Sequence, residues 1–384
     1  MLLVNGPLAN ERTATGRRRL RPAAAWRLWR AGRTTGLGSA VLLGSAVLLT
    51  VLHATLAADP LEAQTLHRFS YRQNQMGAPV ELILYSADER SANTAAEAVW
   101  TRFRQLNRVL SDYDPESELS QLSDTAGSGR KVPVSQDLWT VLQAAQELSA
   151  RSGGAFDITV GPYVKLWRRA RREKQFPPRE RLQTAAQSVG YQFLHLDPAG
   201  RTAQLSRPGM RLDLGGIAAG YACDEALRVL AKLGIRRALI DASGDILTGD
   251  PPPGQSGWKI GIAPLESRTG PPTRYLLLAH AAVTTSGDAW QFVELDGRRY
   301  SHIVDPRTGL GLTTRSSVTV VAGDCITADS LATAACVLGP AKGIALVDQT
   351  AGAAAAIATL ESGKLRTFSS SRMRSIPTAS QPGP

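Results

Sequence analysis

The chain has 384 residues, long enough for one large domain or two ordinary ones with a substantial core. Hydrophobic residues make up 43% and charged residues 20%, a globular composition that excludes a wholly disordered or collagen-like chain. The formal charge of +11 is concentrated in residues 1–36 and 165–181, and the remainder is about neutral. This distribution argues against nucleic acid as a partner.

The N-terminus carries an export pattern. Residues 1–36 are a basic region with eight arginines against one glutamate, and residues 37–58 are a largely apolar run that ends in small residues. That order is typical of a signal peptide, with 37–58 as its h-region, or of an uncleaved membrane anchor, and both stay open. A buried core helix is disfavoured by the neighbouring arginines. Either export interpretation places the rest of the chain on the periplasmic face of the inner membrane.

The elements after the export segment follow from apolar periodicity. Residues 66–85 alternate apolar and polar side chains around Met76-Gly77 and predict two strands or one bent strand. In the later part of the chain, apolar residues at helical spacing predict helices, a turn signal predicts a hairpin, and strand-like runs predict strands. These are helices over 94–110, 137–151, 217–233 and 328–338, a hairpin over 190–205, and strands at 237–241, 258–263, 274–279, 291–295 and 317–321.

Helices and strands alternate without a regular βαβ period, which favours an α+β fold. We therefore expect a single large mixed α/β domain over residues 66–374 and a disordered tail over 375–384. The chain has neither a GxGxxG after a strand nor a GxxxxGK[ST] loop, so the usual dinucleotide and phosphate loops are absent from the sequence.

Residues 211–226 read RLDLGGIAAGYACDEA, in which a predicted strand ends at Asp213, turns at Gly215-Gly216 and enters a helix. Such a junction presents backbone amides to phosphate oxygens, or carbonyls to a metal. The alternative is an ordinary tight turn. In ITADSLATAACVLG, residues 326–339, Asp329 and Thr333 lie one helical turn apart and offer two hard oxygen donors of the kind Mg²⁺ prefers. Here the alternative is that Asp329 caps the helix.

Residues 298–309, RRYSHIVDPRTG, hold His302 and Asp305. A histidine that titrates near neutrality can accept a hydroxyl proton, and a nearby carboxylate could fix its tautomer, although a histidine beside a turn is more often structural. Two further polar segments contain Asp157, after a loop in 152–167, and Tyr113, which could present a ring to a flat ligand, in 111–123.

Taken in order, seven segments resemble the motifs of the FAD:protein FMN transferase (ApbE-like) family, and the resemblance covers roughly residues 76–360. The segments are Met76-Gly77-Ala78, 111–120, 154–167, 213–224, 285–288 (TSGD), 301–309 (SHIVDPRTG) and 328–334 (ADSLATA). The family pattern differs at two of these positions. Ala78 stands where the family has Thr, and Ala219 stands where it has a Lys or Glu near the flavin.

The resemblance implies a T-fold-related domain and a Mg²⁺-dependent transferase. Such an enzyme uses FAD as substrate and attaches FMN to a Thr or Ser hydroxyl of an acceptor flavoprotein, releasing AMP. Carried over by position, the flavin contacts would come from Met76, Tyr113, Ala155, Phe156, Asp157 and Asp213, with Ala219 at the charged position. Asp329, Thr333 and the carbonyl of Gly216 would hold the metal, and His302, beside Asp305, would be the base.

Two other functions fit the same segments. One is a Mg²⁺-dependent FAD pyrophosphatase, in which water replaces the protein hydroxyl and gives free FMN and AMP. The other is a non-catalytic flavin-binding protein, suggested only by Ala219. The basic segment 165–181 is either a solvated helix face or a surface for an acidic partner.

Overall fold

The computed structural model describes residues 65–265, 271–288 and 291–380. The predicted export segments, residues 1–36 and 37–58, lie outside the described residues. The helices in the described part are α1 (Glu89–Leu110), α2 (Glu118–Asp124), α3 (Gln136–Arg151), α4 (Gly161–Glu173), α5 (Arg179–Ala186), α6 (Ala218–Lys232), α7 (Cys325–Asp348) and α8 (Ser371–Ser375).

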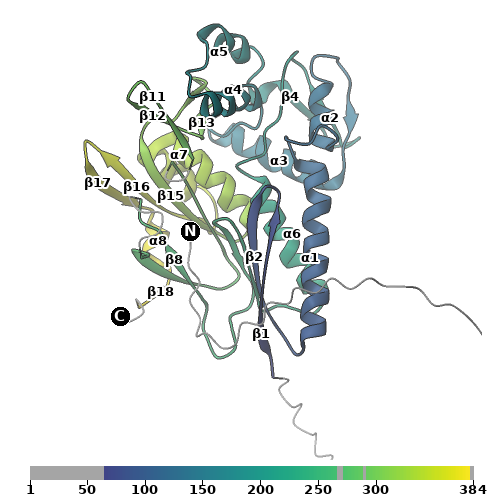
Figure 1. Cartoon of the computed structure of the whole chain (residues 1–384), viewed down its shortest axis with the longest axis vertical. Helices are drawn as coiled ribbons and strands as arrows, with labels where there is room; N and C mark the ends of the chain where they lie inside the picture. The colour runs from purple at the N-terminus through teal and green to yellow at the C-terminus, as the bar shows by residue number, and fades with distance from the viewer. Residues whose placement is uncertain (1–64, 266–270, 289–290, 381–384) are drawn as a thin grey trace, which may run out of the picture. The chain divides into compact units, whose positions relative to one another are not determined.

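The main sheet has eight strands and is antiparallel throughout (Figure 1). In spatial order they are β1 (His67–Gln75), β2 (Ala78–Ser86), β6 (Ala238–Ala242), β7 (Asp245–Thr248), β10 (Ala282–Gly287), β15 (Arg315–Ala322), β16 (Ala354–Glu361) and β17 (Lys364–Ser369). The mixture of this sheet with helices confirms the α+β fold class.

Four smaller sheets accompany it among the described residues. They pair β9 (Arg274–Leu278) with β8 (Trp258–Ile262) and β18 (Thr378–Ala379); β5 (Thr202–Leu205) with β3 (Val132–Pro133) and β4 (Leu194–Asp197); β11 (Phe292–Leu295) with β12 (Arg298–Ser301); and β13 (Val304–Asp305) with β14 (Leu310–Gly311).

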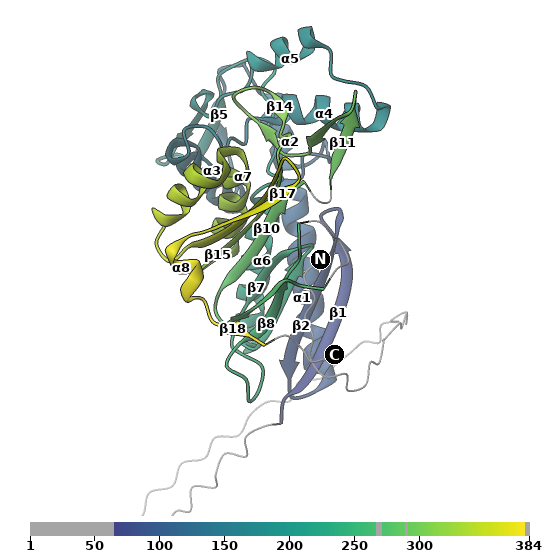
Figure 2. The same ribbon diagram turned by 90° about the vertical axis from the view of Figure 1, so that its left-hand side faces the viewer.

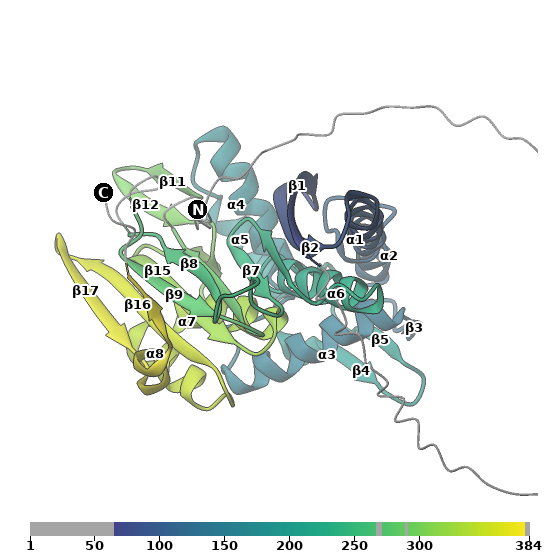
Figure 3. The same cartoon turned by 90° about the horizontal axis from the view of Figure 1, so that it is seen from below.

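Side-chain alternation along the strands gives the main sheet two buried faces. On β2, Leu82 and Leu84 join a core with α1, α6 and α7, whereas Ile83 between them joins a second core with Trp258 and Met373. Helices α1, α6 and α7 therefore cover one face of the main sheet, and β8, β9 and α8 cover the other. Figure 3 shows α1 and α6 beside β2 and β7 in the view from below.

A third, separate cluster lies beyond these two cores. Tyr163 and Trp167 of α4 pack with Val293 and Tyr300 of the β11–β12 hairpin. Trp167 also donates its indole N–H to the carbonyl of Gly309 at 2.8 Å. Figure 2 shows α4, α5, β11 and β14 together at one end of the main sheet. This end carries several of the sequence-predicted site segments.

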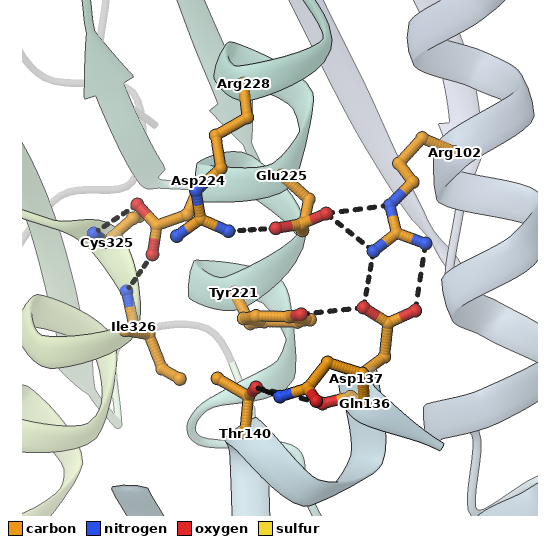
Figure 4. Close-up of polar contacts among 10 residues, drawn as sticks. All are labelled: Arg102, Gln136, Asp137, Thr140, Tyr221, Asp224, Glu225, Arg228, Cys325 and Ile326. Carbon is orange, nitrogen blue, oxygen red and sulfur yellow. Dashed lines mark hydrogen bonds and ion pairs between the residues drawn. The ribbon is translucent and has the colours of Figure 1, made fainter.

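Ionic and capping contacts fix α6 against its neighbours (Figure 4). Arg102 of α1 donates to Glu225 of α6 and to Asp137 of α3, each at 2.9 Å, and the Tyr221 hydroxyl donates to the same Asp137 at 2.7 Å. Asp224 accepts the first two amides of α7, from Cys325 and Ile326, at 2.8 and 2.9 Å. The position of α6 is therefore set from three helices at once.

Most predicted elements are confirmed, but several boundaries are wrong. The predicted helix 94–110 begins at Glu89, after the N-cap Asp88. The predicted helix 328–338 begins earlier because Asp324 caps it, and it resumes after a kink at Gly339 (φ 75°), with Pro340 just inside the second part. The predicted strand ending at Asp213 is only an isolated bridge between Val160 and Arg211. The predicted tail from residue 375 is ordered at its start, since β18 pairs with β9; residues 381–384 are not described.

Within the described residues, α7 is the one helix long and apolar enough to pass for a membrane span. More than half of its apolar stretch is buried in the fold, and it packs against β10 and β15. A helix that is hydrophobic on all sides also occurs in the core of a large protein. The apolar composition of α7 is therefore explained by its place in the core.

Candidate functional site

The residues expected to hold a metal come together where the start of α6 meets α7. A Cβ placed on Gly216 would lie 2.8 Å from Oγ1 of Thr333, so the Gly-Gly turn passes directly against that hydroxyl. Asp329, one helical turn before Thr333, accepts the backbone N–H of Gly220 at 3.2 Å. Its alternative role as the helix cap is excluded, because Asp324 caps α7. The structure thus brings Gly216, Asp329 and Thr333 to one place.

Two carboxyl groups lie close together at this place, that of the buried Asp329 and that of the half-buried Asp245. Burial raises the pKa of Asp329 to about 7, although the Gly220 amide acts in the opposite direction. Burial, followed by repulsion from Asp329, raises the pKa of Asp245 at the start of β7 well above its ordinary value. Asp245 was not among the predicted site residues. A divalent cation would relieve the repulsion between these two acids.

The donor atoms that Gly216, Asp329, Thr333 and Asp245 offer are all oxygens. Only two acids take part, and no group of three His, Cys, Asp or Glu residues suited to a metal occurs in the described part of the chain. Carboxylate, hydroxyl and carbonyl oxygens with few protein ligands are what Mg²⁺ takes, since water or substrate oxygens complete its octahedron. The residues present therefore fit Mg²⁺ better than zinc.

The loop expected to contact FAD between α3 and α4 presents little side chain to solvent. Ala155, Phe156 and Asp157 are 0%, 4% and 6% exposed. The Asp157 carboxylate accepts from the amide and hydroxyl of Thr159 at 2.8 and 2.7 Å, and from the amide of Tyr191 at 2.7 Å. Burial raises the pKa of Asp157 despite these bonds. Asp157 therefore organises the loop, and a ligand here would meet the backbone.

Asp213 and Tyr113 are joined by a residue that sequence reasoning did not single out, Arg168 of α4. Its guanidinium lies 2.9 Å from Oδ2 of Asp213, forms a close ion pair with Asp112, and sits 4.1 Å from the centre of the Tyr113 ring. Oδ1 of Asp213 accepts the amide of Gly215 at 2.9 Å. The Asp213 side chain is thus held from both oxygens.

Two other predicted flavin contacts are placed on neighbouring elements. Met76 occupies the tight turn between β1 and β2 with φ 49° and packs half-buried against the main core. Ala219 lies half-buried in the first turn of α6. Its methyl group brings no charge to the position where the family resemblance expects one.

His302 follows β12 and is oriented by backbone. Its Nδ1 lies 3.1 Å from the carbonyl oxygen of Gln291, which can only accept, so Nδ1 carries the proton and Nε2 is left as the acceptor. Burial lowers the pKa of His302, and the nearby Arg171 lowers it further. A neutral imidazole whose Nε2 can accept a proton is the form a general base requires.

The predicted pairing of Asp305 with His302 is wrong. Both oxygens of Asp305 are engaged by Arg307, from Nε and Nη2 at 2.8 Å, and Oδ1 also accepts the Arg307 amide at 2.9 Å. The guanidinium of Arg307 thus binds the Asp305 carboxylate in a bidentate way, and the two residues are only two positions apart. The role of Asp305 is therefore to stabilise the turn in SHIVDPRTG. The tautomer of His302 is set by the Gln291 carbonyl instead.

Helix α4 connects the flavin segments to the histidine segment. Arg168 reaches Asp213, and three residues later on the helix Arg171 donates to the Gln291 side chain at 2.9 Å, beside His302. A Cβ on Gly161 would meet the Arg211 carbonyl at 2.5 Å, so the start of α4 lies tight against the segment that leads to Asp213. These segments therefore form one site.

The chain matches the ApbE family over residues 76–358, well over half its length. The chain belongs to the ApbE family. It is 34% identical over 274 residues to the FAD:protein FMN transferase of Treponema pallidum, covering 68% of this chain and 75% of that one. The flavin transferase ApbE from Vibrio cholerae superposes with a TM-score of 0.73 at 27% identity, covering 82% of this chain and all of that one.

A second similar structure is the apo form of the Pseudomonas stutzeri flavinyl transferase ApbE, with a TM-score of 0.72 at 30% identity, covering 81% of this chain and 97% of that one. These comparisons confirm the family resemblance and the fold.

Sequence reasoning missed Arg168, Arg171, Asp245 and Gln291. The first two were read as part of a charge run. On the helical wheel of α4, Arg168 and Arg171 lie directly beside the buried Trp167 and Ala170. This position at the edge of the apolar face is the sequence signal that separates them from their exposed neighbours.

Proposed function

We propose that this chain is a Mg²⁺-dependent FAD:protein FMN transferase that attaches FMN to a Thr or Ser hydroxyl of an acceptor flavoprotein. The observation that carries the proposal is the conjunction, on one site, of His302, whose Nδ1 faces the Gln291 carbonyl and leaves Nε2 as the acceptor, and the Gly216, Asp329 and Thr333 oxygens. The names of the similar proteins support the same activity.

In the proposed reaction the acceptor oxygen forms a bond to the phosphorus of the FMN half of FAD. The bond from that phosphorus to the bridging oxygen breaks, and AMP leaves with the electron pair. The proton of the acceptor hydroxyl passes to Nε2 of His302, while the Gln291 carbonyl keeps the other proton on Nδ1. No other group is required to take up that proton.

Asp329, Thr333 and the Gly216 carbonyl are the proposed Mg²⁺ ligands, and the neighbouring Asp245 is the further carboxylate we propose for the metal. Mg²⁺, when bound, supplies positive charge that offsets the charge on the diphosphate oxygens. Because the Gly-Gly turn carries no side chain, the backbone can approach those oxygens closely. Asp213 and Tyr113 are the proposed side-chain contacts for the flavin half, and positioning contributes much of the remaining rate.

The activity is tested by incubating the purified protein with FAD, Mg²⁺ and candidate acceptor flavoproteins. A denaturing gel is then viewed for flavin fluorescence, and the supernatant is chromatographed for FMN and AMP. We expect fluorescence in the acceptor band and equimolar AMP. Free FMN with AMP and a dark acceptor band would instead establish a pyrophosphatase, and FAD binding without either product a non-catalytic flavin-binding protein.

We further propose that the enzyme acts outside the cytoplasm, at the periplasmic face of the inner membrane. The support is the order of the basic region 1–36 and the apolar run 37–58. A reporter that is active only after export, fused after residue 70, should be active. Activity of a cytoplasmic reporter at the same position, with an inactive exported one, would contradict this topology.

A further inference from the structure

Arg168 contacts both of the side chains that the proposed function gives to the flavin half of FAD. One end of its guanidinium, Nη2, lies 2.9 Å from Oδ2 of Asp213, and the other, Nη1, pairs with Asp112. The Tyr113 ring lies over the same guanidinium at 4.1 Å. We propose that Arg168 is a positioning residue for FAD, which fixes the Asp213 carboxylate and supports the Tyr113 ring. This inference rests on the proposed function.

The surroundings of the Asp213 carboxylate favour a cation beside it. Its side chain is only 9% exposed, and it lies near a second carboxylate, Asp112. Burial and then Asp112 raise the pKa of Asp213, while Arg168 and the Gly215 amide act against this shift. Two neighbouring carboxylates in a poorly solvated place repel each other unless a shared cation lies between them. Arg168 is that shared cation.

Tyr113 needs support because most of its side chain is exposed to solvent. It is 75% exposed, on the loop between α1 and α2. An exposed ring samples several orientations, and each ordered contact with a ligand then costs conformational entropy. With one face against the guanidinium, the ring keeps its orientation and its opposite face is left for a flat ligand.

The geometry calls for arginine in particular. The planar guanidinium presents separate N–H groups to two carboxylates and a flat face to an aromatic ring, whereas a lysine ammonium is a single point of charge. The helix that carries it is firmly seated, since Trp167, the preceding residue, donates to the Gly309 carbonyl at 2.8 Å. Arg169, the following residue, is exposed and pairs only with Glu173 among the described residues.

Arg169 therefore provides a matched control on the same helix. The purified full chain and its Arg168→Ala, Arg168→Lys and Arg169→Ala variants are titrated with FAD at equilibrium without acceptor, and FMN transfer is then measured against FAD concentration. We expect Arg168→Ala to raise the Kd and KM for FAD by roughly ten- to a hundred-fold, with kcat at saturating FAD within a few-fold. The Kd and KM of Arg168→Lys should lie between those of Arg168→Ala and the natural chain, and those of Arg169→Ala should equal the natural values.

A second-site variant separates positioning from folding. In the Arg168→Ala chain, Asp112→Asn removes the carboxylate that repels Asp213, so it should restore part of the FAD affinity without raising the melting temperature to match. A loss of affinity that follows the melting temperature and is rescued by neither Arg168→Lys nor Asp112→Asn would overturn the inference. So would an Arg168→Ala chain that binds FAD as the Arg169→Ala chain does.

Failure of this inference is distinguishable from failure of the proposed function. If the natural chain neither binds FAD nor transfers FMN, the proposed function fails and Arg168 loses its role with it. If the natural chain is active and Arg168→Ala is indistinguishable from it, only the positioning role fails.

Discussion

Gly220→Ala is the substitution that most directly probes the crossing of α6 and α7. A Cβ at this position would lie 2.3 Å from the Cys325 carbonyl oxygen and 2.9 Å from the Asp329 Cβ. Since ordinary contact begins at 3.4 Å, the helices must separate by roughly 1 Å at the crossing. The same movement stretches the bond from the Gly220 amide to Asp329 and draws α7 away from Gly216.

Overpacking of this kind costs about 1–3 kcal/mol of unfolding free energy. Helix propensity acts the other way, because alanine is favoured over glycine inside a helix by about 1 kcal/mol, so a net loss cannot come from propensity. Urea unfolding measures the stability, and calorimetric titration with Mg²⁺ measures the metal site. We expect Gly220→Ala to lose both stability and Mg²⁺ affinity.

Gly323→Ala is the matched control. Gly323 lies just before α7, is not among the glycines with positive φ, and would meet nothing within 4 Å of an added Cβ. It should unfold at the same urea concentration and bind Mg²⁺ as the natural chain does. Equal midpoints and equal Mg²⁺ affinities for the two variants would refute the close crossing of α6 and α7.

Three further predictions concern single side chains. His302→Ala should lower FMN transfer by about 10²- to 10⁴-fold and leave the Kd for FAD within a few-fold; in the natural chain at saturating Mg²⁺ the acid limb of the pH–rate profile should lie below the ordinary histidine value of 6.5, because burial lowers this pKa. Asp329→Ala should abolish Mg²⁺-dependent turnover while circular dichroism shows a folded chain, and full activity at low Mg²⁺ would contradict the metal assignment. Burial raises the pKa of Asp224 from 3.8 to about 6, so its contribution to stability is present below pH 3.8 and is lost as pH rises through 6; Asp224→Asn should flatten urea stability over that window.

The sequence was informative where a local pattern fixes the geometry. Asp329 and Thr333 must share a helix face at their spacing, and a bare glycine turn was the feature that allowed Gly216 to pass against Thr333. The alternation around Met76-Gly77 likewise predicted two strands or one bent strand over residues 66–85, and the structure has two strands, β1 and β2, paired across that turn. These inferences needed only residue spacing and side-chain size.

Contacts between distant segments could not be predicted in this way. Asp305 had two neighbours able to use its carboxylate, and the choice of Arg307 over His302 depends on the turn that forms. The partner of His302 is a backbone carbonyl, which carries no residue signal. Arg168 looked like one charge among many, and its role depends on α4 lying against Asp213.

The predicted end of the helix at Gly339 was wrong for a related reason. Glycine with positive φ followed by proline usually ends a helix, and here it does break the regular backbone. Helical structure nevertheless resumes, because proline is acceptable in the first turn of a new segment and Leu346 and Val347 are buried in the main core. Tertiary burial, which spacing alone does not show, decides whether the helix continues.

The central claim is that FMN ends on a hydroxyl of an acceptor protein. Intact-mass spectrometry of an acceptor incubated with this chain, FAD and Mg²⁺ measures that outcome directly, alongside an acceptor whose target Thr or Ser is replaced by Val or Ala. We predict that the natural acceptor gains the mass of one FMN less one water and that the substituted acceptor gains nothing. An unmodified natural acceptor, in the presence of consumed FAD, would contradict the claim.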